Sequence, residues 1–342
     1  MSLSNPEPFV VTAARRSLTV PIVLTTWAVG VLLSPVIIPG MVISDLVARR
    51  RFALTRAMLM VYVYFTWEVL ALAHAIGLFL RKRSMTSEQY IARNTKIEGW
   101  WARSQFDIAV RLFRIKLEIE GVEELSQGPY LLFIRHVSVI DNLLPAVYGV
   151  DRFGIGMRYV INHSLLKDPA IDIIGNRIHC CFVKGGSDDS EKEIERMRII
   201  ARGMTRDDGI VCYPEGTLFS PAKRARIIQR LQDGDDPELL EWARRYQHVL
   251  PPRLGGTMAL LETCPEADVI FCTHAGLEDA LTKASIAAGG LIGRPLRIRF
   301  WRVPAADRPR DAAGLRRWLF AEWAKVDDWV AKHAVEADVR GD

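Results

Sequence analysis

Two long apolar stretches dominate the first part of the chain. Residues 17–47 contain one charged side chain, Asp45, and residues 57–80 are interrupted by Glu68 and His74. Each stretch is longer than the roughly 20 apolar residues that a helix needs to cross a bilayer. Residues 1–94 are therefore predicted to be a membrane anchor with one or two hydrophobic helices.

The polar and proline residues inside these stretches leave the form of the anchor open. Pro35 and Pro39 break helical hydrogen bonds, so residues 17–47 form either one kinked span or the two arms of a re-entrant hairpin. An acid near the bilayer centre costs about 2.5–3.5 kcal/mol. Glu68 and His74 therefore either face the protein or a substrate path, or lie on a shallow helix packed against the following domain.

Basic residues flank both apolar stretches, so the positive-inside rule favours neither orientation. The clusters are Arg15 with Arg16, residues 49–51 with Arg56, and residues 81–83. Clusters on every flank suit a hairpin that returns to one anionic membrane face. We expect an integral membrane protein whose following domain lies on the cytoplasmic side.

The pattern changes after residue 94. Residues 97–114 place apolar side chains at helical spacing, which predicts an amphipathic helix that packs on a soluble core or lies at the headgroup level. Short apolar runs then alternate with helical stretches, so residues 95–342 are predicted to form one α/β layered domain with a largely parallel sheet flanked by helices. The predicted strands are Lys116 to Glu120, Tyr130 to Ile134, Arg158 to Ile161, Ile178 to Val183, Ile210 to Tyr213, Val269 to Thr273 and Leu296 to Arg302. The predicted helices lie near residues 141–149, 164–174, 189–205, 237–246, 253–262 and 311–333.

The charge balance argues against a nucleic-acid partner. The chain has 45 Lys and Arg against 40 Asp and Glu, and residues 1–94 hold ten basic and four acidic side chains, which accounts for the whole surplus. A nucleic-acid binder carries its basic surplus on the folded domain. The five cysteines form no CxxC pair and lie mostly in apolar runs, so we expect buried thiols in a reducing compartment.

Two polar motifs directly follow predicted strands. His136 comes just after residues 130–134, with Asp141 five positions later, and Glu215 comes just after residues 210–213. In parallel sheets, ligands bind at the carboxyl ends of the strands. An acid at this spacing can bring its carboxylate to the histidine Nδ1, which leaves the far nitrogen free to take a proton. His136 and Asp141 are therefore the candidate catalytic pair.

A covalent nucleophile is not evident in the sequence. The chain has no GxSxG elbow, and its cysteines read as buried strand residues. We therefore expect the base to deprotonate a substrate hydroxyl directly. A thioester suits acyl transfer by this route, because a thiol of pKa about 8.5 departs without a strong acid. The expected donor is acyl-CoA or acyl-carrier protein.

Several sequence blocks resemble those of one enzyme family. The stretch "FIRHVSVIDN" (133–142) resembles the HxxxxD motif of the glycerolipid acyltransferases, which are the 1-acylglycerol-3-phosphate acyltransferases and their lysophospholipid relatives. The blocks "CCFVKGG" (180–186) and "VCYPEGTLFSP" (211–221) follow in the family's order and are similar to its FIxR and FPEGTR blocks. The later segments "YQHVLPPRLGG" (246–256) and "LRIRFWRVPAADRP" (296–309) resemble the lysocardiolipin and lysophosphatidylinositol acyltransferase branch.

The resemblance implies roles for particular residues. It makes His136 the general base and Asp141 its orienting partner, and it places Glu215, Gly216 and Thr217 in the acceptor site. It implies transfer of a fatty acyl group to the hydroxyl of a lysophospholipid in phospholipid synthesis or remodelling. The partners would be membrane lipids and acyl-CoA or acyl-carrier protein, and neither a cofactor nor a metal is implied.

Three positions depart from the family pattern. Arg135 stands where a small polar residue usually precedes the histidine, and Gly185 and Leu218 stand where arginines usually bind the acceptor phosphate. Basic side chains nearby are expected to compensate, and lysine does so as a point charge without the bidentate fork of arginine. The candidates are Lys184, Lys223, Arg224 and Arg253, of which Lys184 and Arg253 are predicted substrate-binding residues.

Two other functions remain open from the sequence. The chain could be a catalytically silent membrane scaffold of the same fold, which the Gly185 and Leu218 departures favour. It could also be a metal-dependent lipid phosphoesterase with His136 and Asp141 as ligands, although only Glu215 offers a further ligand near these strand ends.

Overall fold

A seven-stranded sheet forms the centre of the molecule in the computed structural model, which describes residues 7–138, 140–183, 190–278, 285 and 288–339. The strand order is β1-β7-β6-β2-β5-β3-β4, and every neighbouring pair is parallel except β6 and β7. The prediction of a largely parallel sheet flanked by helices is therefore confirmed.

All seven predicted strands are present. Their bounds are β1 (Lys116–Glu120), β2 (Tyr130–Ile134), β3 (Gly156–Asn162), β4 (Cys180–Val183), β5 (Asp208–Cys212), β6 (Asp268–Ala275) and β7 (Pro295–Val303). The central strand β2 is buried along its whole length, which explains why its sequence "YLLFI" is apolar at every position and does not alternate. Its side chains alternate between two hydrophobic cores, one on each face of the sheet.

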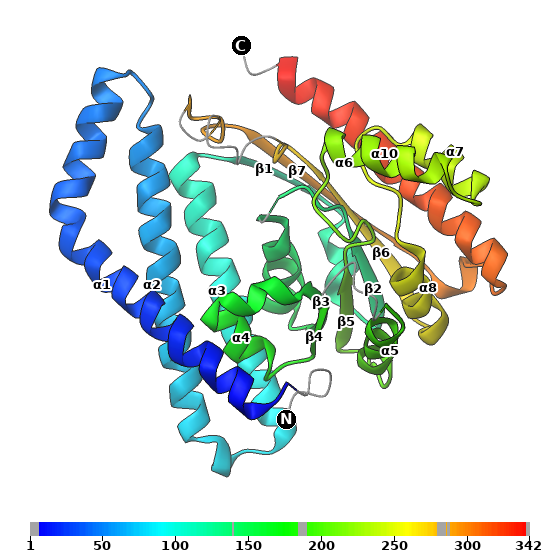
Figure 1. Ribbon diagram of the computed structural model, residues 1–342, viewed down its shortest axis with the longest axis horizontal. Coiled ribbons are helices and arrows are strands. Elements are labelled where there is room, and N and C mark those ends of the chain that lie inside the picture. The colour runs from blue at the N-terminus through cyan, green and yellow to red at the C-terminus, as the bar shows by residue number, and fades with distance from the viewer. Residues whose placement is uncertain (1–6, 139, 184–189, 279–284, 286–287, 340–342) are drawn as a thin grey trace.

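Helices cover both faces of the sheet (Figure 1). On one face the core includes Ala102 and Phe106 of α3 (Ser87–Phe113), together with the irregular helical segment η4 (Pro145–Asp151). On the other face it includes side chains of α5 (Ser190–Ala201), α8 (Leu254–Thr263) and α10 (Ala312–Val339). Further α-helices in the described residues are α4 (Pro169–Gly175), α6 (Pro221–Gln232) and α7 (Pro237–Arg245). Short helical turns there are η1 (Lys82–Ser84), η2 (Val122–Ser126), η3 (Ile140–Leu143), η5 (His163–Lys167) and η6 (Ala305–Asp307).

The helix predictions hold with four differences. The helix expected at 141–149 is a 3₁₀ turn followed by a π-helical segment, and the one expected at 164–174 is interrupted between η5 and α4. Helix α6 was not predicted, because its sequence "PAKRARIIQRLQ" is mostly polar and none of its residues is buried. The amphipathic helix expected at 97–114 begins earlier, at Ser87, so the predicted domain boundary at residue 94 lies inside α3.

The two apolar stretches form the long antiparallel helices α1 (Phe9–Val47) and α2 (Ala53–Leu80) at one side of the molecule (Figure 1). Helix α1 is continuous through Pro35 and Pro39, which favours the single kinked helix over two re-entrant arms. Both helices are long and apolar enough to cross a membrane. The lone acid Asp45 is buried, and it accepts hydrogen bonds from Leu54 N and Thr55 N at the start of α2.

Polar contacts attach the helix pair to the rest of the protein. Glu68 of α2 is fully buried and accepts hydrogen bonds from Trp101 Nε1 and from Ala170 N, so this acid faces the protein. His74 is exposed and bonds Leu70 O, so it does not pair with Glu68.

The first turns of α1 are held separately, by an ion pair to α4. Arg15 and Arg16 both bind the buried carboxylate of Asp172, at 3.0 Å for the shortest N–O distance of each. One of the basic clusters that flank the apolar stretches is thus used within the protein.

We expect the protein to stay with membranes after washing with high salt and with alkaline carbonate. The reason is that α1 buries little of its apolar surface and leaves many large side chains exposed, among them Phe9, Leu18, Leu32, Val36 and Ile43. Apolar patches of this extent on a soluble monomer are rare. Sedimentation and immunoblotting measure the outcome, and release by salt alone would show that neither helix inserts.

Candidate active site

His136 lies at the carboxyl end of β2, between the parallel neighbours β5 and β6. Its backbone is held on both sides by the segment that follows β5. His136 N donates to Glu215 Oε1 at 2.8 Å, and His136 O accepts from Phe219 N at 2.7 Å. The sequence blocks around residues 136 and 215 therefore come together, as expected for two parallel strands that end at the same edge of the sheet.

Asp141 orients the imidazole of His136. Its Oδ1 lies 2.9 Å from His136 Nδ1, and its Oδ2 accepts from Val137 N and Ser138 N, both at 2.8 Å. The Asp141 side chain is fully buried. Burial alone would raise the pKa of this carboxyl, but the hydrogen bonds from His136 and His274 outweigh it and lower the pKa. Asp141 is thus ionised, and it fixes the His136 tautomer that carries the proton on Nδ1.

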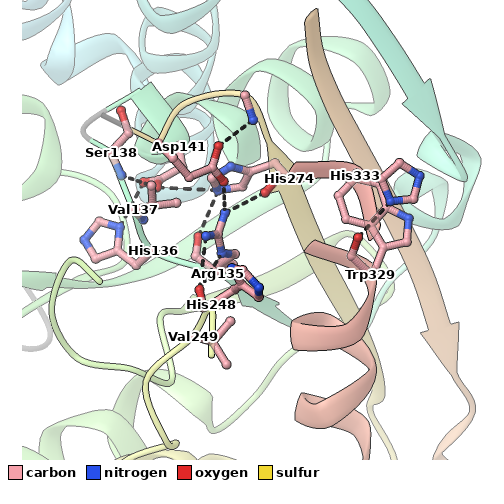
Figure 2. A network of polar contacts seen from close by, with 12 residues as sticks. Arg135, His136, Val137, Ser138, Asp141, His248, Val249, His274, Trp329 and His333 are labelled. Atoms are coloured by element: carbon pink, nitrogen blue, oxygen red, sulfur yellow. Dashed lines mark hydrogen bonds and ion pairs between the residues drawn. The ribbon is translucent and has the colours of Figure 1, made fainter. Parts of the chain in front are cut away.

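A network of buried polar side chains contacts Asp141 and the backbone next to His136 (Figure 2). His274 at the end of β6 places Nε2 3.0 Å from Arg135 O and 3.5 Å from Asp141 Oδ2. The guanidinium of Arg135 is buried and donates to the carbonyl oxygens of His248 and His274 and to Glu278. Arg135 therefore ties three segments together under the site, which accounts for a large cation where the family has a small polar residue.

Glu215 accepts hydrogen bonds from two backbone amides of the site. Its Oε1 binds His136 N, and its Oε2 accepts from Leu250 N at 2.8 Å. Burial raises the pKa of this carboxyl to about 8, although the two backbone hydrogen bonds and Arg135 oppose the shift. The described contacts of Glu215 therefore hold two loops together, and its predicted contact with an acceptor stays a prediction.

Three further predicted site residues, Gly216, Thr217 and Arg253, lie close to Glu215. Gly216 has φ +64°, which favours glycine, and a Cβ atom there would lie 2.6 Å from Arg253 Cδ, so a larger residue would also displace the Arg253 side chain. Lys223 of α6 donates to Thr217 Oγ1 at 2.8 Å and to Leu218 O at 2.9 Å. A cation thus stands directly at Leu218, where the family motif has arginine. Lys184 and Gly185 lie outside the described residues.

A large apolar cavity opens beside the catalytic pair. Its volume is about 650 Å³, and it lies between α2, α3, α4 and β3. Tyr213 connects the two sites, because it lines the cavity and its ring centroid lies 4.3 Å from that of His136. Most of the lining side chains are apolar, such as Met60, Phe65, Phe106, Ile171 and Ile174.

The structure brings His136, Asp141, Glu215, Gly216, Thr217 and Arg253 together. The sequence analysis missed Tyr213 and His274. Tyr213 ends the predicted strand 210–213 and His274 directly follows the predicted strand 269–273, so their positions at strand ends could have identified them. Among the residues that the structure describes, no three His, Cys, Asp or Glu side chains gather as metal ligands. His136 Nδ1 and both Asp141 oxygens are already engaged with protein groups.

Comparisons with known proteins bear on the fold and on the class of enzyme. The acyltransferase family model matches residues 116–273, which supports an acyltransferase. The crystal structure of the 1-acyl-sn-glycerophosphate (LPA) acyltransferase PlsC from Thermotoga maritima has a TM-score of 0.51 at 16% sequence identity, covering 84% of this chain and 99% of that one. The two chains share a fold. A search of curated proteins finds no significant match.

Asp141→Asn should lower turnover by about 10² to 10⁴ while donor binding is retained. The asparagine oxygen is expected to keep the two backbone donors, which turns its amide N–H toward His136 Nδ1. His136 must then carry its proton on Nε2 and cannot accept another. Steady-state kinetics of acyl transfer measures the effect. Weakened donor binding at unchanged turnover would assign Asp141 a purely structural role.

Glu215→Gln should destabilise the fold and slow turnover together. A glutamine amide N–H would face one of the two backbone N–H donors, so one buried hydrogen bond is lost at a cost of about 1–3 kcal/mol.

The same variant tests the protonation of Glu215. With a folded-state pKa of about 8 against 4.5, the folded protein holds a proton that the unfolded chain has released, so stability should fall as the pH rises between these values. The variant lacks this contribution, and the difference in melting temperature across this pH range measures it. Parallel pH curves for the two proteins would contradict the assignment.

Proposed function

We propose that the protein is a membrane-bound O-acyltransferase that transfers a fatty acyl group from acyl-CoA or acyl-carrier protein to the hydroxyl of a lysophospholipid. One observation carries the proposal. A histidine oriented by a buried carboxylate lies beside an apolar cavity, and Tyr213 both contacts the histidine ring and lines the cavity.

The cavity suits the apolar part of an acyl substrate. Burying a methylene group contributes about 0.8 kcal/mol, so a chain of ordinary fatty-acid length gains much of its binding energy from such a lining. The polar reaction centre lies at one side of this space, at His136 and Asp141. An amphipathic substrate with a reactive head and a long apolar tail matches this division.

The chemistry follows from the orientation of His136. With its proton on Nδ1, the free Nε2 takes the proton of the acceptor hydroxyl as the oxygen attacks the thioester carbonyl carbon. The carbon–sulfur bond then breaks, and the departing thiolate takes the proton from Nε2. The acyl ester and a free thiol result, and neither a cofactor nor a metal is needed.

The cations near residues 216–218 suit a phosphodiester acceptor. Lys223 lies at Thr217 and Leu218, and Arg253 lies over Gly216. A terminal phosphate monoester carries nearly two charges and favours several bidentate partners, whereas a diester carries one. We therefore favour a lysophospholipid with a larger headgroup, as in the lysocardiolipin and lysophosphatidylinositol branch, over lysophosphatidic acid.

Purified protein should transfer a labelled acyl group from acyl-CoA to lysophosphatidylinositol, lysophosphatidylglycerol or lysocardiolipin faster than to lysophosphatidic acid. A non-phosphorylated lipid alcohol completes the panel, and acyl-carrier protein replaces CoA in a parallel series. Thin-layer separation of the labelled products measures the rates. His136→Ala is the inactive reference, and full activity in that variant would refute the mechanism.

Lys223→Ala separates the acceptor assignment from the chemistry. It should raise KM for phosphorylated acceptors and leave the lipid alcohol unchanged, because it removes a charge and no catalytic group. Arg230→Ala, on an exposed position of the same helix, is the matched control. A clear preference for lysophosphatidic acid that Lys223→Ala leaves intact would contradict the acceptor proposal. Absence of transfer to every acceptor would favour the silent scaffold.

A further inference from the structure

Three polar side chains on the lining of the apolar cavity each have a buried atom without a hydrogen bond of normal distance and angle, although the Tyr159 hydroxyl is close enough to the Glu98 carboxyl to affect its pKa. These atoms are Glu98 Oε2, Gln105 Nε2 and the Tyr159 hydroxyl oxygen. Gln105 is 4% exposed and Tyr159 is 7% exposed. These groups come from two different elements, because Glu98 and Gln105 are two turns apart on α3 and Tyr159 lies on β3.

This arrangement is costly if the cavity holds only a plain hydrocarbon chain. Each buried polar group left unpaired costs about 1–3 kcal/mol, and leucine or phenylalanine would fill the same positions without that cost. The three groups are also complementary. Burial raises the pKa of the Glu98 carboxyl to about 8, although the nearby Tyr159 hydroxyl opposes the shift, so at neutral pH the acid both donates and accepts. Gln105 Nε2 and the Tyr159 hydroxyl are further donors.

Tyr159 lies away from the reaction centre, along the cavity. In the sheet, Tyr159 of β3 is paired with Val211 of β5, and Tyr213, which contacts His136, is two residues beyond Val211. Strand spacing and rise place the positions of Tyr159 and Tyr213 roughly 8 Å apart. A ligand group that reaches Tyr159 is therefore distant from the carbonyl that reacts at His136.

We propose that Glu98, Gln105 and Tyr159 bind a hydroxyl group carried partway along the acyl chain, so that the preferred donor is a hydroxyacyl thioester. The inference rests on the proposed acyl transfer and names its donor class. A hydroxyl both donates and accepts, which matches this set of groups, whereas a keto oxygen or a double bond cannot donate.

The test compares thioester donors of one chain length that are unsubstituted or carry a hydroxyl next to the thioester, at mid-chain, or at the far end. For the wild-type protein, the ratio of kcat/KM between the mid-chain hydroxyacyl donor and the plain donor should be about ten or more, which corresponds to one good hydrogen bond. The other two positions should give ratios near one.

Variants assign the preference to the three groups. Tyr159→Phe and Glu98→Leu should bring the ratio close to one, while Glu98→Gln keeps a donor and an acceptor and should retain most of it. Glu98→Leu should also melt no lower than the wild type without substrate, because it removes an unpaired polar group. Ile161→Val removes one apolar methylene from the lining and should change both donors equally.

The outcomes separate this inference from the proposed function. If the plain donor is transferred as fast as every hydroxyacyl donor, or if the preference survives both Tyr159→Phe and Glu98→Leu, the inference is wrong and water occupies the polar groups. If neither donor class supports transfer, the proposed acyl transfer itself fails. A loss of folding in one variant leaves the other variant and the wild-type ratio to decide.

Discussion

The buried negative charge of Asp141 is the constraint on which the site depends. A carboxylate without water is tolerated only where hydrogen bonds satisfy it, and here one oxygen takes His136 Nδ1 and the other takes two backbone amides. Those amides belong to the turn that directly follows β2, so a side-chain oxygen of residue 141 holds the turn in this shape. The orientation of the base and the shape of the loop are therefore one feature.

The three central strands contribute to the same arrangement. Strand β2 supplies His136, β6 supplies His274 against Asp141 Oδ2, and the segment after β5 supplies Glu215, which holds His136 N and Leu250 N. Because parallel strands end at one edge, these groups meet without long loops. The sheet register thus sets the position of the general base.

Sequence patterns predicted the sheet well because buried parallel strands are continuous apolar runs, as in β2. They also predicted the His136 and Asp141 pair, whose partners are five residues apart. They could not predict contacts between distant residues. His274 lies at the end of the apolar run "VIFCTHA" and gave no separate signal, and Arg135 was a departure from a motif until its bonds to His248 O and His274 O gave it a role. The polar helix α6 was missed because it buries no residue.

Contacts between distant residues also decide how the apolar helices α1 and α2 are placed, and sequence patterns could not predict them. The sequence left open what Glu68 faces, because its partners Trp101 and Ala170 are more than 30 and 100 positions away. Tyr64 and Phe65 of α2, on the same helix as Glu68, line the cavity together with α3 and α4. The hairpin is thus not an interchangeable tether. An unrelated helix of equal length and hydropathy would still attach the chain to a bilayer, but it would leave the cavity open on one side.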